Sequence, residues 1–258
     1  MRPVDFGKAA REYARYRGGF PDTFYERLAQ HGMGLPGQRV LDLGTGTGNL
    51  ARALVRRGCQ VTGLDASEDL IAEARRMGAQ EGIEVEYVTA RAERSGLQGQ
   101  SFDGVTAGQC WQWFDGAKAA LECKRLLVPG GWLAIVHFDW LPLAGNVVEA
   151  TEKLIEDYNT EWTLGGGTGL YPQFLKDLGM AGLESIETFS FDQAMSFSHE
   201  AWRGRVRASA GLLASLPRDV VARFDEKLRT LLVERFPAEP LVVPHRLWAI
   251  TCRRAGKA

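Results

Sequence analysis

The sequence predicts an α/β fold in which a seven-stranded, mostly parallel sheet carries helices on both faces. Two observations lead to this prediction. From residue 39 onward, short apolar runs of strand length alternate with segments of helical period. The first run leads directly into the glycine-rich loop 44–48, which is followed by a helix. Because parallel neighbours need a crossover connection, usually a helix, this alternation indicates a parallel sheet.

Seven segments have the length and composition of strands. The first is Arg-Val-Leu-Asp-Leu at 39–43, and the second leads directly into Asp65. Pro129, Gly130 and Gly131 form a predicted turn before the fifth strand. We therefore expect strands at 39–43, 60–64, 85–88, 102–107, 132–138, 185–191 and 241–252.

Helical patterns fill most of the remaining chain. Aromatic and alanine residues recur at helical spacing over 5–17, and two glycines end this pattern before Pro21 and Asp22 start a second helix. Ser67 is a suitable N-cap for a helix that begins at Glu68. Further helices are expected at 49–55, 68–77, 117–127, 147–158 and 171–178, and two more within 198–236.

These elements predict a helical N-terminal cap at 1–34 and one larger domain at 35–258. The regular alternation loosens beyond Asp139, where a helix and the glycine-rich stretch 165–169 follow. We interpret about 141–175 as a lid-like insertion over the ligand-binding site that the motifs below predict. The helices within 198–236 then precede the last strand.

Composition excludes several classes of protein. The 258 residues are 45% hydrophobic and 24% charged, as in ordinary globular proteins. The 31 Lys and Arg residues against 32 Asp and Glu give a net charge of −1, which opposes nucleic-acid binding. No segment has the apolar core of a signal peptide or the length of a membrane span. We expect a cytoplasmic protein that contacts neither membrane nor nucleic acid.

The four cysteines do not indicate a metal site. They show neither CxxC pairing nor a histidine partner at the spacing of zinc ligands. We interpret them as reduced thiols and expect no bound metal. The cysteines are Cys59, Cys110, Cys123 and Cys252.

The glycine-rich loop has the features of a ligand cradle. Glycines let backbone N–H groups approach a ligand closely, although a tight turn without a ligand is the alternative. Asp65, at the end of the next strand, suits hydrogen bonds from both hydroxyls of a ribose. This arrangement predicts a cofactor that contains adenosine. Dinucleotide fingerprints require a third glycine where this chain has Asn49, so a nicotinamide cofactor is the second choice.

The residues at this point resemble a known family. VLDLGTGTGNLA at 40–51 is similar to the first motif of class I S-adenosylmethionine-dependent methyltransferases, which have a Rossmann-like fold. The resemblance continues through Ala92 and Glu93, SFDGVTAGQCWQWF and LLVPGGWLAIV, and covers most of 35–138. Together with the opening AREYARYRGGFP, these motifs resemble the type-11 branch of small-molecule methyltransferases, which includes trans-aconitate-like enzymes.

The resemblance implies a binding site for S-adenosyl-L-methionine, with S-adenosyl-L-homocysteine as the product. The loop glycines would pack against the methionine part, Asp65 would take the ribose, and Ala92 would meet the adenine through its backbone. At Arg91 the chain departs from its relatives, which usually carry an acidic residue there. The expected donor-binding residues are Arg17, Gly44, Thr45, Gly46, Gly48, Asn49, Asp65, Ala66, Ala92, Glu93 and Gln109.

The acceptor site is expected after the fourth strand, because open α/β sheets bind ligands at the carboxyl ends of their strands. Trp111 and Trp113 would stack on a planar acceptor or flank the sulfonium; core packing is the alternative. His137 ends the fifth strand and is the candidate general base, with a purely structural histidine as the alternative.

Two further segments carry candidate acceptor residues. In similar enzymes the N-terminal helix folds across the donor, so Tyr13 and Tyr16 would close the site; simple packing of an amphipathic helix is the alternative. Arg207, in an arginine-rich stretch, would bind an anionic acceptor through paired hydrogen bonds, unless it belongs to a solvated helix face.

We therefore predict an S-adenosylmethionine-dependent methyltransferase that acts on an oxygen, a nitrogen or a carbon atom of a small organic molecule. Transfer would be an in-line displacement in a closed cleft, by a monomer or a homodimer. One alternative is a methyltransferase-like module that binds without catalysis. Another is a nucleotide-dependent oxidoreductase, which Asn49 and the lack of a Tyr-x-x-x-Lys pair after the fourth strand disfavour.

Overall fold

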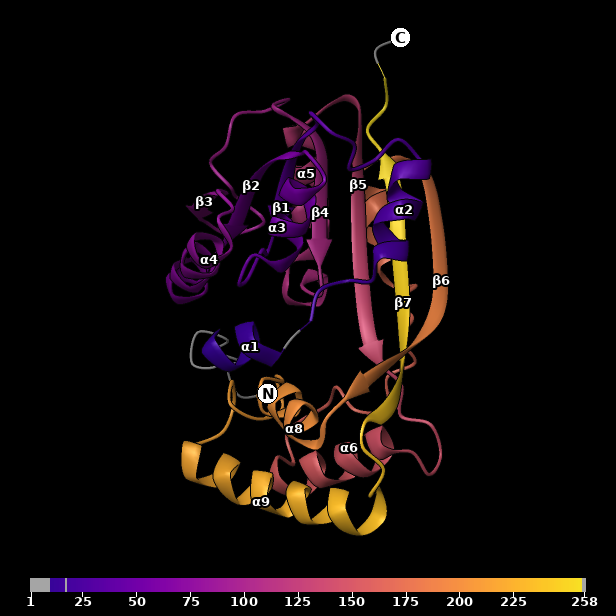
Figure 1. Cartoon of the computed structure of the whole chain (residues 1–258). Coiled ribbons are helices and arrows are strands. Elements are labelled where there is room, and N and C mark those ends of the chain that lie inside the picture. Colours follow the sequence, from indigo (N-terminus) through magenta and orange to yellow (C-terminus); the bar gives the residue numbers. More distant parts are fainter. Residues whose placement is uncertain (1–9, 17, 257–258) are drawn as a thin grey trace. The chain divides into compact units, whose positions relative to one another are not determined.

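The computed structural model of the chain describes residues 10–16 and 18–256 (Figure 1). It contains one seven-stranded sheet with strand order β3-β2-β1-β4-β5-β7-β6. The strands are β1 (Arg39–Leu43), β2 (Gln60–Asp65), β3 (Glu86–Thr89), β4 (Phe102–Gly108), β5 (Leu127–Trp140), β6 (Glu184–Phe197) and β7 (Leu241–Arg253).

The helices lie where the sequence predicts them, with ends that differ by a few residues. They are α1 (Ala10–Tyr16), α2 (Asp22–Gln30), α3 (Asn49–Arg56), α4 (Glu68–Glu81), α5 (Gly116–Leu126), α6 (Val147–Tyr158), α7 (Phe174–Met180), α8 (His199–Arg207) and α9 (Arg218–Arg235). The Ser67 hydroxyl accepts the N–H of Leu70, so Ser67 is the N-cap of α4 as predicted.

The sheet topology confirms the predicted fold class. β1 pairs in parallel with β2 and β4, and the parallel pairing continues to β3 on one side and β5 on the other. Figure 1 shows β7 running opposite to β5. The chain order reverses between β1 and β4, which is the point where open α/β sheets bind their ligands.

The fifth strand begins earlier than predicted. Phe102 pairs with Leu127 and Gly104 pairs with Trp132, so β5 has more residues than β4 between these two pairs. The predicted turn at 129–131 is therefore an irregularity inside β5. Gly130 has a φ of +77°, a conformation that glycine adopts at little cost.

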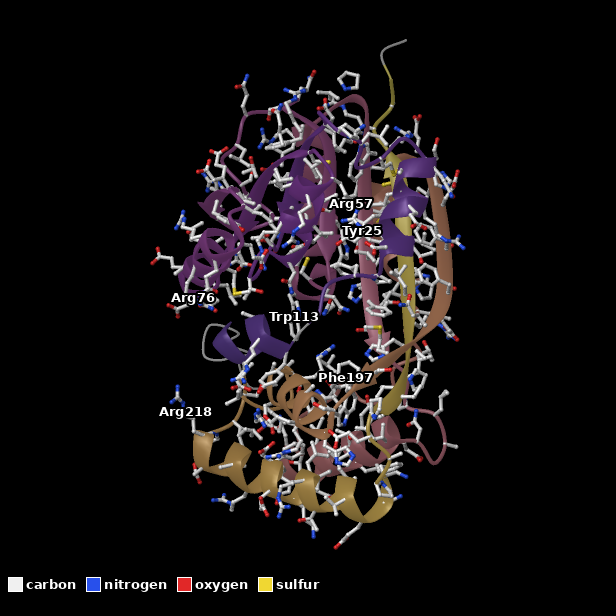
Figure 2. All side chains as sticks on the ribbon, viewed as in Figure 1. Tyr25, Arg57, Arg76, Trp113, Phe197 and Arg218 are labelled. Atoms are coloured by element: carbon white, nitrogen blue, oxygen red, sulfur yellow. The ribbon has the colours of Figure 1, made fainter. Side chains whose placement is uncertain are left out.

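Both faces of the sheet are covered. Val105 and Ala107 of β4 belong to one core cluster with residues of α5 and α7. Alternate residues of a strand point to opposite faces, and Gly108 accordingly approaches Leu50 of α3 on the other side. This second face also carries α2. The guanidinium of Arg57, after α3, lies 3.8 Å from the centre of the Tyr25 ring in α2 (Figure 2).

The chain forms two compact units. One comprises Gly19–Phe138, Tyr171–Ser190 and the described residues of Leu247–Ala258, and it holds most of the sheet. We call it the sheet unit. The other, the helical unit, comprises the described residues of Met1–Gly18, Asp139–Leu170 and Phe191–Arg246. The predicted N-terminal cap at 1–34 is thus divided, because α1 belongs to the helical unit and α2 to the sheet unit.

Within the described part of the chain, none of the helices combines the length and the apolar character needed to cross a lipid bilayer. The same residues contain no group of three or more His, Cys, Asp or Glu side chains arranged to hold a metal ion. The four cysteines are buried and free.

Gly104 provides a test of the packing between β4 and β5. A Cβ at this position would overlap the ring of the buried Trp132. We expect Gly104→Ala to lower the free energy of unfolding by about 2 to 3 kcal/mol, because the indole must leave its place. Urea denaturation measures this loss. Gly179→Ala is the control, since nothing lies within 4 Å of that Cβ. Equal stabilities of the two variants would contradict the proposed packing.

Candidate active site

The loop after β1 is shaped by three glycines with positive φ. The φ angles are +65° at Gly44, +55° at Gly46 and +77° at Gly48. A Cβ at Gly44 would lie 2.8 Å from the Cβ of Cys110, so this position also lacks room for a side chain. By contrast, nothing lies within 4 Å of a Cβ built on Gly46. The loop therefore packs tightly at one end and borders open space at its centre.

Asp65 lies beside the centre of this loop. One carboxylate oxygen accepts the N–H of Gly46 at 2.9 Å, and the other accepts the N–H of Ser67 at 2.9 Å. Burial raises the pKa of Asp65, although the backbone N–H groups of Ser67, Gly46 and Ala66 oppose this shift. A carboxylate has about four acceptor sites. The two hydrogen bonds from Gly46 and Ser67 leave Asp65 with acceptor capacity for two hydroxyl groups.

Asp42 of β1 stabilises the same loop through hydrogen bonds. Its carboxylate is buried and accepts the hydroxyl of Thr45 at 2.6 Å and that of Thr106 at 2.9 Å. Burial raises its pKa to about 6, and the two threonine hydroxyls moderate this shift. The side chain of Thr45, predicted to touch the donor, is therefore engaged with Asp42. Its backbone N–H donates to the carbonyl of Leu64 at 2.9 Å.

Arg52 of α3 also stabilises the loop, and no pattern in the sequence indicates this role. Its side chain is 2% exposed. It donates to the Thr47 carbonyl at 2.6 Å, to the Asn49 side-chain oxygen at 2.9 Å and to Glu81 at 2.9 Å. The side chain of Asn49, another predicted donor residue, is thus oriented by Arg52. Helical spacing places Arg52 one turn after Asn49, but nothing in the sequence shows that this side is covered by α4.

The hydroxyl of Thr47 is a second feature of the loop that the sequence does not indicate. Thr47 is buried, and its hydroxyl has no hydrogen-bond partner among the described residues. Buried polar groups are nearly always satisfied by protein, water or ligand. Together with the open space at Gly46 and the acceptor capacity of Asp65, this hydroxyl shows that the loop fits a polar ligand.

The predicted adenine-side residues follow β2 and β3. Ala66 is exposed directly after Asp65, whereas Ala92 is buried. Burial of Glu93 opposes ionisation, but the N–H groups of Asp115 and of Glu93 itself and the nearby Arg91 lower its pKa overall. Its carboxylate accepts the Asp115 N–H at 3.0 Å and lies 3.5 Å from Arg91. Glu93 therefore ties the segment after β3 to the start of α5.

The segment after β4 begins with a strained residue. Gln109 has a φ of +61°, which is uncommon for a residue other than glycine and is found preferentially at functional sites. Its backbone N–H donates to the carbonyl of Val136 at 2.9 Å, and its amide nitrogen donates to that of Phe138 at 2.6 Å. Gln109 thus fastens the end of β4 to the end of β5, beside the loop.

The two tryptophans of this segment differ in position. Trp111 is 1% exposed, belongs to the core and donates its indole N–H to Asp177 at 3.0 Å. For Trp111 the structure thus shows the alternative of core packing, and we leave it out of the acceptor site. Trp113 is 36% exposed at the end of the same 3₁₀ turn (Figure 2). Of the two indoles, that of Trp113 remains a candidate for contact with an acceptor.

His137 lies inside an aromatic cluster. Its ring is 1% exposed, and its centre is 4.0 Å from that of Tyr171 and 5.6 Å from that of Phe174. The ring packs in the core near the end of β5, as expected for a structural histidine. Its role as a general base stays a prediction.

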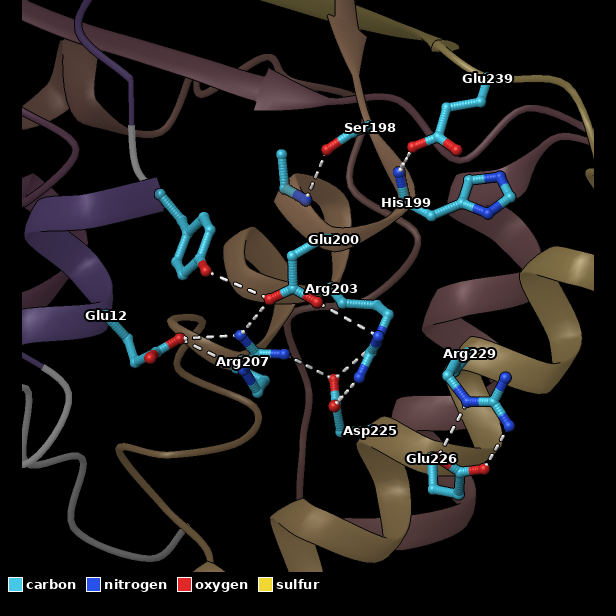
Figure 3. Close-up of polar contacts among 12 residues, drawn as sticks. Glu12, Ser198, His199, Glu200, Arg203, Arg207, Asp225, Glu226, Arg229 and Glu239 are labelled. Atoms are coloured by element: carbon cyan, nitrogen blue, oxygen red, sulfur yellow. Dashed lines mark hydrogen bonds and ion pairs between the residues drawn. The ribbon is translucent and has the colours of Figure 1, made fainter.

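Arg207, the candidate acceptor ligand in α8, lies in a cluster of charges (Figure 3). The guanidinium of Arg207 pairs with Glu12 at 3.2 Å, Glu200 at 3.2 Å and Asp225 at 2.8 Å. Burial lowers the pKa of Arg207, but Asp225 and the other two carboxylates raise it overall. The cation predicted to bind an anionic acceptor is therefore already engaged by three carboxylates of the protein.

The N-terminal candidates are described only in part. Tyr16 donates its hydroxyl to Glu200 at 3.2 Å. The side chain of Tyr13 and the whole of Arg17 lie outside the described residues. Their predicted contacts with acceptor and donor stay predictions.

Comparisons with known proteins show the family to which this chain belongs. Residues 41–135 match a family model described as a methyltransferase domain. The chain is 30% identical over 178 residues to the ubiquinone biosynthesis O-methyltransferase of Xanthomonas oryzae pv. oryzae, which covers 68% of this chain and 72% of that relative. The corresponding protein of Xanthomonas campestris pv. campestris is also 30% identical over 178 residues, with the same coverage.

Solved structures share the fold. A structure from Anaeromyxobacter dehalogenans described as a type II methyltransferase has a TM-score of 0.63 and 21% identity, covering 94% of this chain and 100% of that one. Phosphoethanolamine N-methyltransferase 2 from Haemonchus contortus, in complex with phosphomonomethylethanolamine and S-adenosylhomocysteine, has a TM-score of 0.58 and 19% identity. That comparison covers 95% of this chain and 57% of the other.

The raised pKa of Asp42 predicts a pH-dependent effect on stability. The folded-state pKa of about 6 lies above the ordinary value of 3.8, so the neutral form is favoured by folding. The resulting contribution to stability is fully present below pH 3.8 and is lost as the pH rises through 6. The loss amounts to about 3 kcal/mol.

Asp42→Asn removes this titration. We expect the free energy of unfolding of the variant, relative to the original protein, to rise by about 2 kcal/mol between pH 4.5 and 7. Urea denaturation at both pH values measures the change. A difference between the two proteins that stays constant with pH would show that Asp42 does not titrate in this range.

Proposed function

The chain belongs to the S-adenosylmethionine-dependent methyltransferases, and on this premise we propose that it binds the donor along loop 44–48 and methylates a hydroxyl oxygen of a small organic molecule. The observation that carries the proposal is the hydrogen bond from the Gly46 N–H to Asp65, which places this carboxylate beside the open centre of the loop. When bound, S-adenosylmethionine supplies an electrophilic methyl group on a sulfonium.

Gly46 and Thr47 of the loop and three residues beside it each have a part in the proposed binding of the donor. The carboxylate of Asp65 accepts the two ribose hydroxyls while it keeps the N–H of Gly46. The missing side chain at Gly46 lets the donor approach the backbone, and the buried Thr47 hydroxyl offers a polar contact. Asp42 and Arg52 hold the loop in this shape through their hydrogen bonds to Thr45 and Thr47.

Alignment is the main contribution of the protein to catalysis. Methyl transfer is an in-line displacement, so the acceptor atom, the methyl group and the sulfur must lie on one line. Holding reactants in this geometry is worth roughly 7 to 11 kcal/mol in favourable cases. Gln109, which joins the ends of β4 and β5, and the exposed ring of Trp113 provide the surface that orients the acceptor.

An oxygen acceptor is favoured by the relatives. The relatives at 30% identity are named as O-methyltransferases. The family model that matches this chain spans the loop and Asp65. A hydroxyl group must lose its proton during transfer, and His137 is the predicted acceptor of that proton. The cytoplasmic location and the monomeric or homodimeric state are predictions that stand beside this proposal.

The donor site is tested by isothermal titration with S-adenosylhomocysteine, with NAD and NADP in parallel. We expect micromolar binding of S-adenosylhomocysteine alone. Asp65→Ala loses two hydrogen bonds to a charged group and should weaken this binding by about a hundredfold. Asp69→Ala, which removes an exposed carboxylate in the first turn of α4, is the control. Unchanged affinity in a folded Asp65→Ala variant, or binding of a dinucleotide instead, would refute the site.

The role of His137 is tested with His137→Phe, which keeps the ring packed against Tyr171 and removes the base. Once an acceptor is known, we expect kcat to fall by about a hundredfold or more at unchanged affinity for S-adenosylhomocysteine. Steady-state kinetics with labelled donor measures this loss. Turnover within a few-fold of the original protein would mean that alignment suffices and that His137 is structural.

A further inference from the structure

The side chain of Tyr87 in β3 reaches across β2 toward the glycine-rich loop. β3 is the edge strand beside β2, and Tyr87 is the register partner of Gly63 in β2. A Cβ at Gly63 would lie 2.7 Å from two carbons of the Tyr87 ring, so the ring occupies the place of a side chain at 63. Glycine inside a strand often marks a close approach of this kind. The missing side chain at Gly63 therefore gives the Tyr87 ring its path over β2.

The hydroxyl of Tyr87 contacts the last residue of the loop. A Cβ at Gly48 would overlap this hydroxyl oxygen, and it would also lie 2.9 Å from the guanidinium of Arg52 and 3.3 Å from Ala74 of α4. The hydroxyl oxygen itself is buried. Gly48 has a φ of +77° and is the N-cap of α3. Tyr87 thus fills the space beside the point where the loop turns into α3.

This contact completes the set that fixes the loop. Hydrogen bonds from neighbouring side chains hold Thr45 and Thr47. Gly48 is held by packing against Tyr87, which depends on the size of the side chain at 87. Gly46, between these residues, borders open space. Every residue of this set belongs to the sheet unit.

We propose that Tyr87 is a positioning residue of the donor site, which holds loop 44–48 through its contacts with Gly63 and Gly48 and does not touch the donor. The proposal rests on the proposed function, because this loop is the proposed binding site for the donor. A loop that is already held in one shape does not need to be ordered when the ligand binds. Loss of the Tyr87 contacts therefore weakens donor binding.

The first test is titration of Tyr87 variants with S-adenosylhomocysteine. Tyr87→Val removes the ring and the hydroxyl, and we expect it to weaken binding by about tenfold. Tyr87→Phe keeps the ring over Gly63 and should recover most of this loss, with binding about two- to threefold weaker than in the original protein. Gly104→Ala, which disturbs the packing of Trp132 in the amino half of β4, is the control for lowered stability. We expect its affinity to stay within about twofold. Urea denaturation confirms that each variant is folded.

A double-mutant cycle tests the path through Gly63. Gly63→Ala pushes the Tyr87 ring from its place and should weaken binding about as much as Tyr87→Val does. In the variant that carries both substitutions, the added methyl group has no ring to displace, so we expect no further loss. The added methyl group would also lie 3.0 Å from the hydroxyl of Thr45. An effect through Thr45 would persist in the double variant and would make the two losses additive.

Hydrogen exchange follows the loop without any ligand. The backbone N–H groups of Thr45, Gly46 and Gly48 are hydrogen-bonded within the protein, so their exchange reports on the order of the loop. We expect Tyr87→Val to speed this exchange and Gly104→Ala to leave it unchanged.

The outcomes separate this proposal from its alternatives. Unchanged affinity in a folded Tyr87→Val variant, or additive losses from Gly63→Ala and Tyr87→Val, would overturn it. Equal weakening by Gly104→Ala and Tyr87→Val would mean general destabilisation of the sheet unit and would also overturn it. If the original protein fails to bind S-adenosylhomocysteine, the proposed function fails, and the exchange of the loop still decides whether Tyr87 holds it.

Discussion

The site depends on one interaction, the hydrogen bond from the backbone N–H of Gly46 to the carboxylate of Asp65. It joins the centre of the loop after β1 to the end of β2, so the carboxylate that we propose as the ribose ligand lies beside the open centre of the loop. Asp42 and Arg52 stabilise this arrangement through hydrogen bonds to the loop. Each is buried and each bonds to a threonine of the loop, Asp42 through the hydroxyl of Thr45 and Arg52 through the carbonyl of Thr47.

Two largely buried arginines hold parts of the chain in place. Arg52 forms hydrogen bonds with the loop and an ion pair with Glu81. Arg207 forms ion pairs with three carboxylates of the helical unit. Each cation fixes the position of a segment that sequence motifs link to the ligand. The exposed candidate for acceptor contact is the indole of Trp113.

The fold and the glycine-rich loop after β1 were predictable from the sequence because their signals are local. Strand, glycine loop and helix follow one another directly, and Asp65 is located by its place at the end of the next strand. Side-chain partners from distant segments were not predictable. Trp111 and Trp113 look equivalent in the sequence, yet Asp177 of α7 accepts the indole N–H of Trp111 in the core. The partners of Arg207 likewise come from α1 and α9, and no local pattern indicates them.

The most direct test of this account is a crystal structure of the protein with S-adenosylhomocysteine. We expect both ribose hydroxyls within hydrogen-bonding distance of the Asp65 carboxylate, while the bond between Asp65 and the N–H of Gly46 persists. We also expect the amino-acid part of the ligand along residues 44–48. A ligand bound elsewhere, or a ribose that leaves Asp65 untouched, would contradict the claim that this loop and this carboxylate form the donor site.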